Sequence, residues 1–328
     1  MPRTARRREA SVVTGTVRNS LFLIGLAALW LASSRSATAL SGADLERMRQ
    51  EKRVALVIGN GNYRNFTVLD NPVNDANGVG RALRDAGFEV ILRVDATRDD
   101  MTAALQSFRE SLQNADVGLF YYAGHAAQVD WRNFMLPVAA ALDASRNLDS
   151  LQQQVAQESI DLDTVLKLMD SSGANTRGRR LNIVILDACR DNPFIAQAQE
   201  LSRSLSRSTG KTPIAIGTGL AQSFAPARTF LAYSTAPGQV ASDGPSDGKR
   251  RNSPYSGALI EALAVPGLKL EDVFKQVRNS VAAATRQEQI PWDNSSVFDD
   301  FYFRLPATAE VAGAAPQKRS VNTTFVSP

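Results

Sequence analysis

The chain has 328 residues, of which 44% are hydrophobic, and a formal net charge of +4 at pH 7. A chain of this length and composition can bury one large core, so we expect one domain of about 250 residues with extensions. The small positive charge does not indicate nucleic-acid binding, because much of the basic excess lies in the first 18 residues. We therefore expect no nucleic-acid partner.

The N-terminus has the order of a secretory signal peptide. Basic residues come first, the apolar run 21–32 follows, and small residues at positions 37 and 39 offer a cleavage site. The apolar run is 12 residues long, whereas a membrane-spanning helix needs about 20. We therefore predict a signal peptide over residues 1–39 and export to the periplasm or the medium. A membrane anchor is the alternative if this segment is not cleaved.

Strands and helices are expected to alternate beyond a lead-in segment, residues 40–51. Continuous apolar runs predict buried strands, and apolar residues spaced every three or four positions predict helices. Strands are expected at 53–59, 89–95, 116–124, 180–188, 229–236 and 297–303. Helices are expected at 44–52, 74–88, 100–115, 162–172, 255–264 and 270–286.

This alternation predicts an α/β fold with a mostly parallel central sheet of about six strands and helices on both faces. The domain is expected over residues 52–304, and the Pro- and Ala-rich residues 305–328 are expected to form a disordered tail. Segments 195–228 and 242–254 lack periodicity and are predicted to be long loops.

The chain has one cysteine, Cys189, and one histidine, His125. Each is expected directly after a buried strand, and open parallel sheets bind ligands beyond the carboxyl ends of their strands. A neighbouring imidazole raises the thiolate fraction of a thiol, and a Cys–His pair is the minimal unit for covalent acyl transfer. The alternative is that Cys189 is a small buried side chain without chemistry.

The backbone N–H groups of Cys189 and of Ala126, which follows His125, are the expected donors to an oxyanion. The glycine-rich run at 59–63 lacks the spacing of a dinucleotide-binding loop, so no nucleotide site is predicted. No cofactor is expected. No metal-ligand spacing stands out, and the sequence leaves calcium dependence open.

Several motifs resemble the caspase-like cysteine peptidases (peptidase C14), nearest the bacterial metacaspase-type branch. They are YYAGH at 121–125, DACRD at 187–191, AYSTAPGQVASDG at 232–244 and SPYSGAL at 253–259. The resemblance covers roughly residues 52–304. It implies a caspase-like α/β/α sandwich, with Cys189 as the nucleophile and His125 as the general acid and base.

The resemblance also implies a substrate class. Asp187 matches the metacaspase-type members, which cleave after Arg or Lys through acidic pocket residues, and Asp75 and Asp243 match further acidic positions of that pocket. Carboxylates complement a guanidinium group. From the residues alone, Asp75 can equally cap the helix predicted at 74–88, and Asp243 can be an ordinary turn residue.

One position departs from the family pattern. Glycine normally follows the catalytic histidine, and this chain has Ala126. Alanine keeps the N–H donor, but a site that demands a positive φ would strain alanine and misdirect that donor. An inactive or weak caspase-fold interaction or regulatory module of the cell envelope is therefore the main alternative. Another thiol-dependent hydrolase or transferase that uses the same Cys–His pair is a third.

The sequence thus predicts an exported cysteine endopeptidase that cleaves protein substrates after Arg or Lys through a thioacyl-enzyme. Self-processing is expected in the basic loops, at Arg203, Arg207, Lys211 or residues 249–251, because these loops flank the active edge. The membrane is a partner only if the N-terminal segment stays uncleaved.

Overall fold

The computed structural model describes residues 42–142, 148–171, 180–189, 220–237 and 252–306, with short pieces at 199–200, 203–204, 206–207 and 216–217. Of Cys189 and a few further residues (148–151 and 216–217) only the backbone is described. The predicted signal peptide, residues 307–328 of the predicted tail, most of the two predicted loops, and Asp243 lie outside the described residues. Across the ranges that are described, no helix has the length and apolar character needed to cross a membrane.

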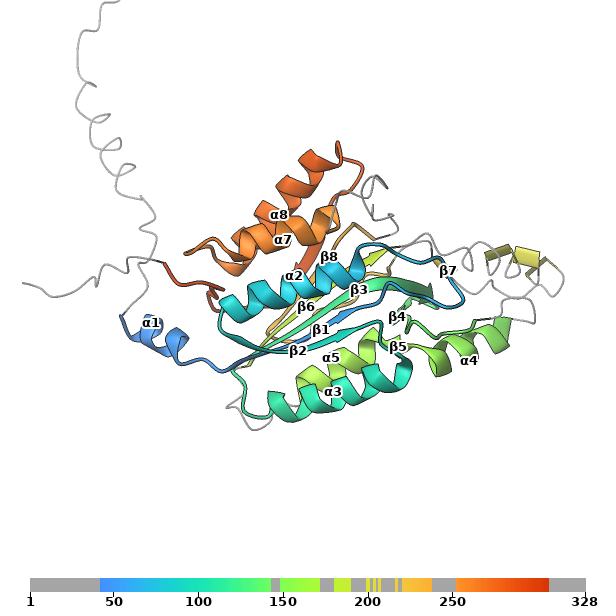
Figure 1. Cartoon of the computed structure of the whole chain (residues 1–328), viewed down its shortest axis with the longest axis horizontal. Helices are drawn as coiled ribbons and strands as arrows, with labels where there is room; N and C mark the ends of the chain where they lie inside the picture. Colours follow the sequence, from blue (N-terminus) through green and yellow to red (C-terminus); the bar gives the residue numbers. More distant parts are fainter. Residues whose placement is uncertain are drawn as a thin grey trace, which may run out of the picture. The chain divides into compact units, whose positions relative to one another are not determined.

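The central sheet is mixed and mostly parallel, with the strand order β2-β1-β3-β6-β8-β9 (Figure 1). Its strands are β2 (Phe88–Val94), β1 (Arg53–Gly59), β3 (Val117–Val129), β6 (Leu181–Cys189), β8 (Thr229–Tyr233) and β9 (Trp292–Ser295). Neighbouring strands from β2 to β8 run parallel, and β9 at the edge is antiparallel to β8. The predicted α/β fold with about six strands is confirmed.

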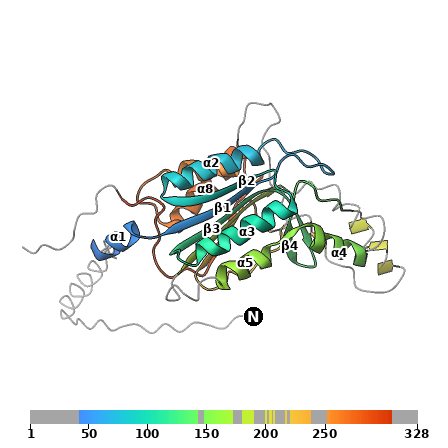
Figure 2. The same ribbon diagram turned by 60° about the horizontal axis from the view of Figure 1, so that its bottom comes forward.

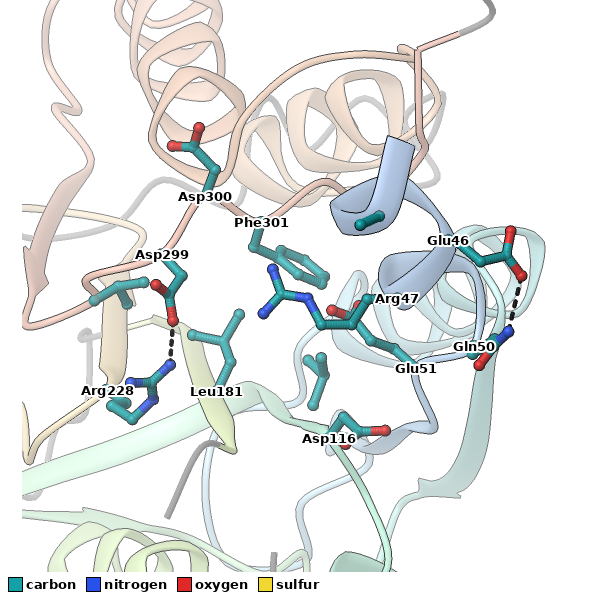
Figure 3. Close-up of a pocket in the computed structure, with 13 residues that line it drawn as sticks. Glu46, Arg47, Gln50, Glu51, Asp116, Leu181, Arg228, Asp299, Asp300 and Phe301 are labelled. Atoms are coloured by element: carbon teal, nitrogen blue, oxygen red, sulfur yellow. Dashed lines mark hydrogen bonds and ion pairs between the residues drawn. The ribbon is translucent and has the colours of Figure 1, made fainter. Parts of the chain in front are cut away.

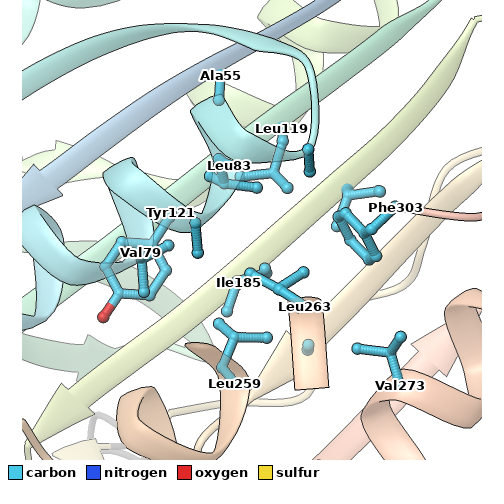
Figure 4. Close-up of a cluster of buried hydrophobic side chains, with 14 of the residues drawn as sticks. Ala55, Val79, Leu83, Leu119, Tyr121, Ile185, Leu259, Leu263, Val273 and Phe303 are labelled. Carbon is cyan, nitrogen blue, oxygen red and sulfur yellow. The ribbon is translucent and has the colours of Figure 1, made fainter. Parts of the chain in front are cut away.

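Helices cover both faces of this sheet (Figures 1 and 2). One face carries α2 (Pro72–Asp85), α7 (Pro254–Leu263) and α8 (Leu270–Ala284), and the other carries α3 (Arg98–Leu112) and α5 (Leu162–Ser171). Because side chains alternate along a strand, each strand feeds both cores. In β3, Leu119 and Tyr121 pack toward α2 and α7 (Figure 4), whereas Phe120 and Tyr122 pack toward α3 and α5.

The helix predicted at 44–52 is α1 (Gly42–Arg49). Smaller elements were not predicted, and they are β4 (Arg132–Met135), α4 (Leu148–Glu158), β5 (Ile160–Asp161) and β7 (Ile216–Gly217). The second half of β3 leaves the parallel sheet and pairs with β4 on one side and β7 on the other, antiparallel to both. These short strands were not predicted, because runs of two to four residues carry no readable period.

Two predicted strands are corrected by the structure. The strand expected at 116–124 does not end at Gly124 but continues to Val129. The last strand is β9, not residues 297–303, which bury Phe301 and Phe303 in the core without joining the central sheet. Burial of aromatic side chains there mimics the pattern of a strand, because periodicity reports burial and not backbone pairing.

Candidate active site

The single histidine and the single cysteine lie opposite each other on neighbouring strands. The parallel register of β3 and β6 ends with the pair His125–Cys189, and adjacent strands are about 4.8 Å apart. The pairing of β3 with β1 ends two residues earlier, at Ala123. His125 therefore lies inside β3 rather than after it, but still at the carboxyl edge of the parallel sheet. Cys189 is the last residue of β6.

The imidazole of His125 is buried, with 1% of the residue exposed. Its Nε2 lies 2.8 Å from the carbonyl oxygen of Thr67, in the segment between β1 and α2. A carbonyl oxygen can only accept, so Nε2 carries the hydrogen, and Nδ1 is the nitrogen that takes up a proton in chemistry. The ring also contacts Tyr63, with the ring centroids 4.5 Å apart. The Thr67 carbonyl thus selects one tautomer of the histidine.

Two tyrosines hold the backbone of His125. The His125 N–H donates to the hydroxyl of Tyr63 over 2.8 Å, and the hydroxyl of Tyr122 donates to the His125 carbonyl over 2.7 Å. The two hydroxyl oxygens are themselves 3.2 Å apart. The sequence reasoning did not assign a role to either tyrosine, because periodicity places Tyr122 in a buried strand without saying where its hydroxyl points.

Gly124 makes this arrangement sterically feasible. Its φ is +147°, and a Cβ there would lie 2.6 Å from the Tyr63 hydroxyl, 2.8 Å from the Tyr122 hydroxyl and 2.9 Å from the carbonyl of Asn60. Any side chain would therefore meet both its own backbone strain and the groups that hold His125.

Ala126 lies in unstrained extended backbone. It is not among the residues with positive φ, and it stands opposite Met135 in the β3–β4 ladder. Because the Leu136 N–H donates to the His125 carbonyl over 3.0 Å, the Ala126–Met135 pair is a non-hydrogen-bonded one. The Ala126 N–H therefore points to the opposite side of β3, toward β6. The backbone strain that a positive φ would impose on alanine is therefore absent at Ala126.

Two of the three predicted pocket carboxylates meet at the start of α7. Ser253 connects them: its N–H donates to Asp75 Oδ1 over 2.9 Å, and its hydroxyl donates to Asp187 Oδ2 over 2.6 Å. The hydroxyl of Ser256 also donates to Asp187 Oδ2, over 2.6 Å. The interpretation of Asp75 as a helix cap is wrong, because α2 begins at Pro72 with Asn71 at its cap.

The two carboxylates create a negative region in the core beside β3. Asp75 is 1% and Asp187 is 4% exposed. Burial, followed by the charges of Asp187 and Asp75, holds the pKa of the Tyr121 hydroxyl well above its usual value. Burial, and then the charge of Asp187, likewise raises the pKa of Tyr255. The charge of Asp187 thus acts on both tyrosine hydroxyls, on the face of the sheet that α2 and α7 cover.

A separate cavity of about 620 Å³ lies at the opposite edge of the sheet (Figure 3). Val117 and Leu181, the first residues of β3 and β6, form part of its wall, and Arg47 of α1 reaches into it. It is therefore distinct from the edge that holds His125 and Cys189. In the described part of the chain, no three or more His, Cys, Asp or Glu side chains gather where they could hold a metal ion.

Comparison with known proteins identifies a family whose model matches most of the chain. The family model for the caspase domain (Peptidase C14) matches residues 52–302. Human mucosa-associated lymphoid tissue lymphoma translocation protein 1 is 32% identical over 138 residues, and its mouse homolog is 30% identical over 138 residues. Each match covers 42% of this chain but 15% of the relative, so the chain spans a small part of these longer proteins.

We predict that Gly124→Ala lowers the free energy of unfolding by about 2–4 kcal/mol, because the new Cβ combines a strained φ with overpacking against two hydroxyls. Urea unfolding measures this change. The matched control is Gly257→Ala in α7, where the nearest neighbouring atom to a new Cβ is 4.0 Å away. Similar losses in both variants would contradict the steric role of Gly124.

We predict that Ala126→Gly leaves the rate of peptide hydrolysis within about threefold of the original, because the backbone at Ala126 is already relaxed. Initial rates on one peptide, with both proteins at equal concentration, measure the effect. A tenfold or larger gain would mean that the working enzyme needs a conformation that only glycine adopts.

Proposed function

This chain belongs to the caspase-domain family, and we propose that it is a cysteine endopeptidase of the metacaspase type that hydrolyses peptide bonds after Arg or Lys. The observation that carries the proposal is the register that places His125 opposite Cys189 at the carboxyl edge of the sheet. The buried carboxylates of Asp75 and Asp187 support the basic specificity.

In the proposed reaction the Cys189 thiol gives its proton to His125 Nδ1, and the resulting thiolate attacks the carbonyl carbon of the scissile bond. The N–H groups of Ala126 and Cys189 donate to the oxyanion. The imidazolium then protonates the leaving amine, the C–N bond breaks and a thioacyl-enzyme remains. Water, deprotonated by His125, hydrolyses the thioester and restores the thiol.

The proposed specificity for a basic residue rests on the buried carboxylates of Asp75 and Asp187. A guanidinium or ammonium group of the substrate is the natural partner of carboxylates held out of water, where charge-assisted hydrogen bonds are strong. Asp187 lies two residues before the proposed nucleophile, so the pocket and the thiol belong to the same strand. Asp243, outside the described residues, is proposed as a third acidic group of this pocket.

We also propose that the protein works outside the cytoplasm, in the periplasm or the medium, because residues 1–39 have the order of a signal peptide. It contacts the membrane only if this segment is retained. A non-catalytic envelope module is the chief alternative, and its best support in the sequence is the strain expected at Ala126. Since Ala126 adopts ordinary strand backbone, that support is lost.

A panel of fluorogenic peptides that differ only in the residue before the scissile bond tests the specificity. We expect turnover with Arg and Lys, none with Asp, and none at all by Cys189→Ala. Asp187→Asn is expected to lower kcat/KM for the Arg peptide about a hundredfold, because a buried charge pair is lost. Asp85→Asn, an exposed carboxylate at the far end of α2, serves as the matched control.

The panel is run with and without calcium, since the chain leaves that requirement open. Turnover after Asp alone would refute the acidic pocket. Absence of turnover with every peptide, together with no labelling by a thiol-reactive inhibitor, would favour the non-catalytic module. Labelling without peptide turnover would favour another thiol-dependent hydrolase or transferase.

Self-processing is the second prediction of this function. Arg203 and Arg207 are exposed, with 61% and 72% of their side chains accessible, and both pair only with Glu200 among the described residues. Surface ion pairs of this kind are weak, about 0–1 kcal/mol, so they do not shield these positions from a peptidase. We expect purified protein to cut itself at Arg203, Arg207, Lys211 or residues 249–251.

Gel electrophoresis over time, with N-terminal sequencing of the fragments, locates the cuts. Cys189→Ala is the control and is expected to stay intact. Identical band patterns for the two proteins would reject self-processing.

A further inference from the structure

Residues at the start of α7 form hydrogen bonds with both buried carboxylates, Asp75 and Asp187. Ser253, the N-cap of α7, bonds to Asp75 through its N–H and to Asp187 through its hydroxyl. Ser256, in the same turn, adds a second hydroxyl to Asp187. The hydroxyl of Tyr121 then lies 2.6 Å from the Ser256 hydroxyl. Four elements, α2, β3, β6 and α7, therefore meet in one chain of hydrogen bonds.

The direction of these hydrogen bonds follows from the chemistry of their end point. An ionised carboxylate only accepts, so Ser256 gives its one hydroxyl proton to Asp187, and Tyr121 must donate to Ser256. Ser253 likewise donates to Asp187 while its oxygen accepts the Ser256 N–H over 3.0 Å. The hydroxyls of Ser253 and Ser256 thus both donate to Asp187 Oδ2, and the Tyr121 hydroxyl supports the second of them. Donors gathered on one carboxylate oxygen favour its charged form.

The helix itself adds to this preference. α7 is 10 residues long and begins with its partially positive N-terminal end at Asp75 and Asp187. Two negative charges that are buried close together repel each other and lose their hydration. Donors that are fixed before the substrate arrives offset this cost and hold each carboxylate in one orientation.

Tyr121 is the member of this hydrogen-bond chain that is farthest from Asp187. Its ring packs in the apolar cluster between the sheet and α2, while its hydroxyl points away from the other labelled side chains (Figure 4). Ser256 and Tyr121 both have an exposed fraction of 0%. Because both are fully buried, neither has solvent as an alternative partner, and the Tyr121 hydroxyl keeps the Ser256 hydroxyl oriented toward Asp187.

We propose that Ser256 and Tyr121 are positioning residues that hold the Asp187 carboxylate in the charged, oriented form which selects a guanidinium group. This inference rests on the proposed function, because it assigns Asp187 to the pocket for the basic residue. Neither side chain needs to contact the substrate. Ser253 shares the role, but its loss would also remove the cap of α7 and confuse the test.

The test compares two peptides that differ only in arginine or citrulline before the scissile bond, since citrulline has the shape of arginine without its charge. For Ser256→Ala we expect kcat/KM on the arginine peptide to fall about ten- to a hundredfold, mainly through KM. The citrulline rate should stay nearly constant. Tyr121→Phe should reduce the arginine-to-citrulline ratio about threefold, because it removes only the outer hydroxyl.

Two further variants separate positioning from general stability. Ser256→Thr keeps the hydroxyl and is expected to restore most of the ratio. Ser280→Ala, an exposed serine inside α8, is the matched control and should leave the ratio unchanged. Thermal unfolding and the alkylation rate of Cys189 are measured for every variant. Equal losses on both peptides, or an unchanged ratio in Ser256→Ala, would overturn the positioning role while leaving the proposed peptidase intact.

Binding of agmatine, a free guanidinium compound, makes the inference independent of turnover. Calorimetry is expected to detect agmatine binding to the original protein and a tenfold or greater weakening in Ser256→Ala. If no peptide is cleaved but this weakening is found, the proposed function fails and the positioning role stands. If the original protein neither cleaves peptides nor binds agmatine, both fail.

Discussion

The parallel register between β3 and β6 is the constraint on which the rest of the site depends. It is held by apolar cores on both faces, because a one-residue slip of β3 against β6 would move Tyr121 to the face of Tyr122 and Tyr122 to the opposite face. A slip of β3 by two residues would preserve the faces, but it would bring a side chain into the place of Gly124, against the Tyr63 hydroxyl and the Asn60 carbonyl. The register that brings His125 opposite Cys189 is therefore the one that packs.

The two faces of the sheet contribute differently to the site. The face covered by α3 and α5 is mainly apolar, and its Tyr122 hydroxyl lies at the edge of that core, where it holds the backbone of His125. The face covered by α2 and α7 buries Asp75 and Asp187 together with their serine donors. Buried polar groups are costly unless they are satisfied, and here each bond that satisfies one also orients a group of the site.

Local structure and site chemistry use the same residues at the start of α7. Ser253 caps the helix and Pro254 occupies its first turn, which is a strong local signal for a helix start. The same serine then supports both carboxylates. A residue that looks fully explained by local helix chemistry thus has a second role, which only its neighbours from α2 and β6 reveal.

Much of the fold and part of the site could be read from the sequence alone. Apolar runs and helical spacing located most strands and helices, and the strand ends placed His125 and Cys189 at one edge, because burial period and strand polarity are local properties. The roles of Tyr63, Thr67, Ser256 and Tyr121 could not be read, since each depends on contacts between residues about 60 to 135 positions apart. The relaxed backbone of Ala126 and the bond from Asp75 to Ser253 likewise required the tertiary structure. Periodicity specifies which side chains are buried, whereas only the folded chain decides which polar atoms they meet.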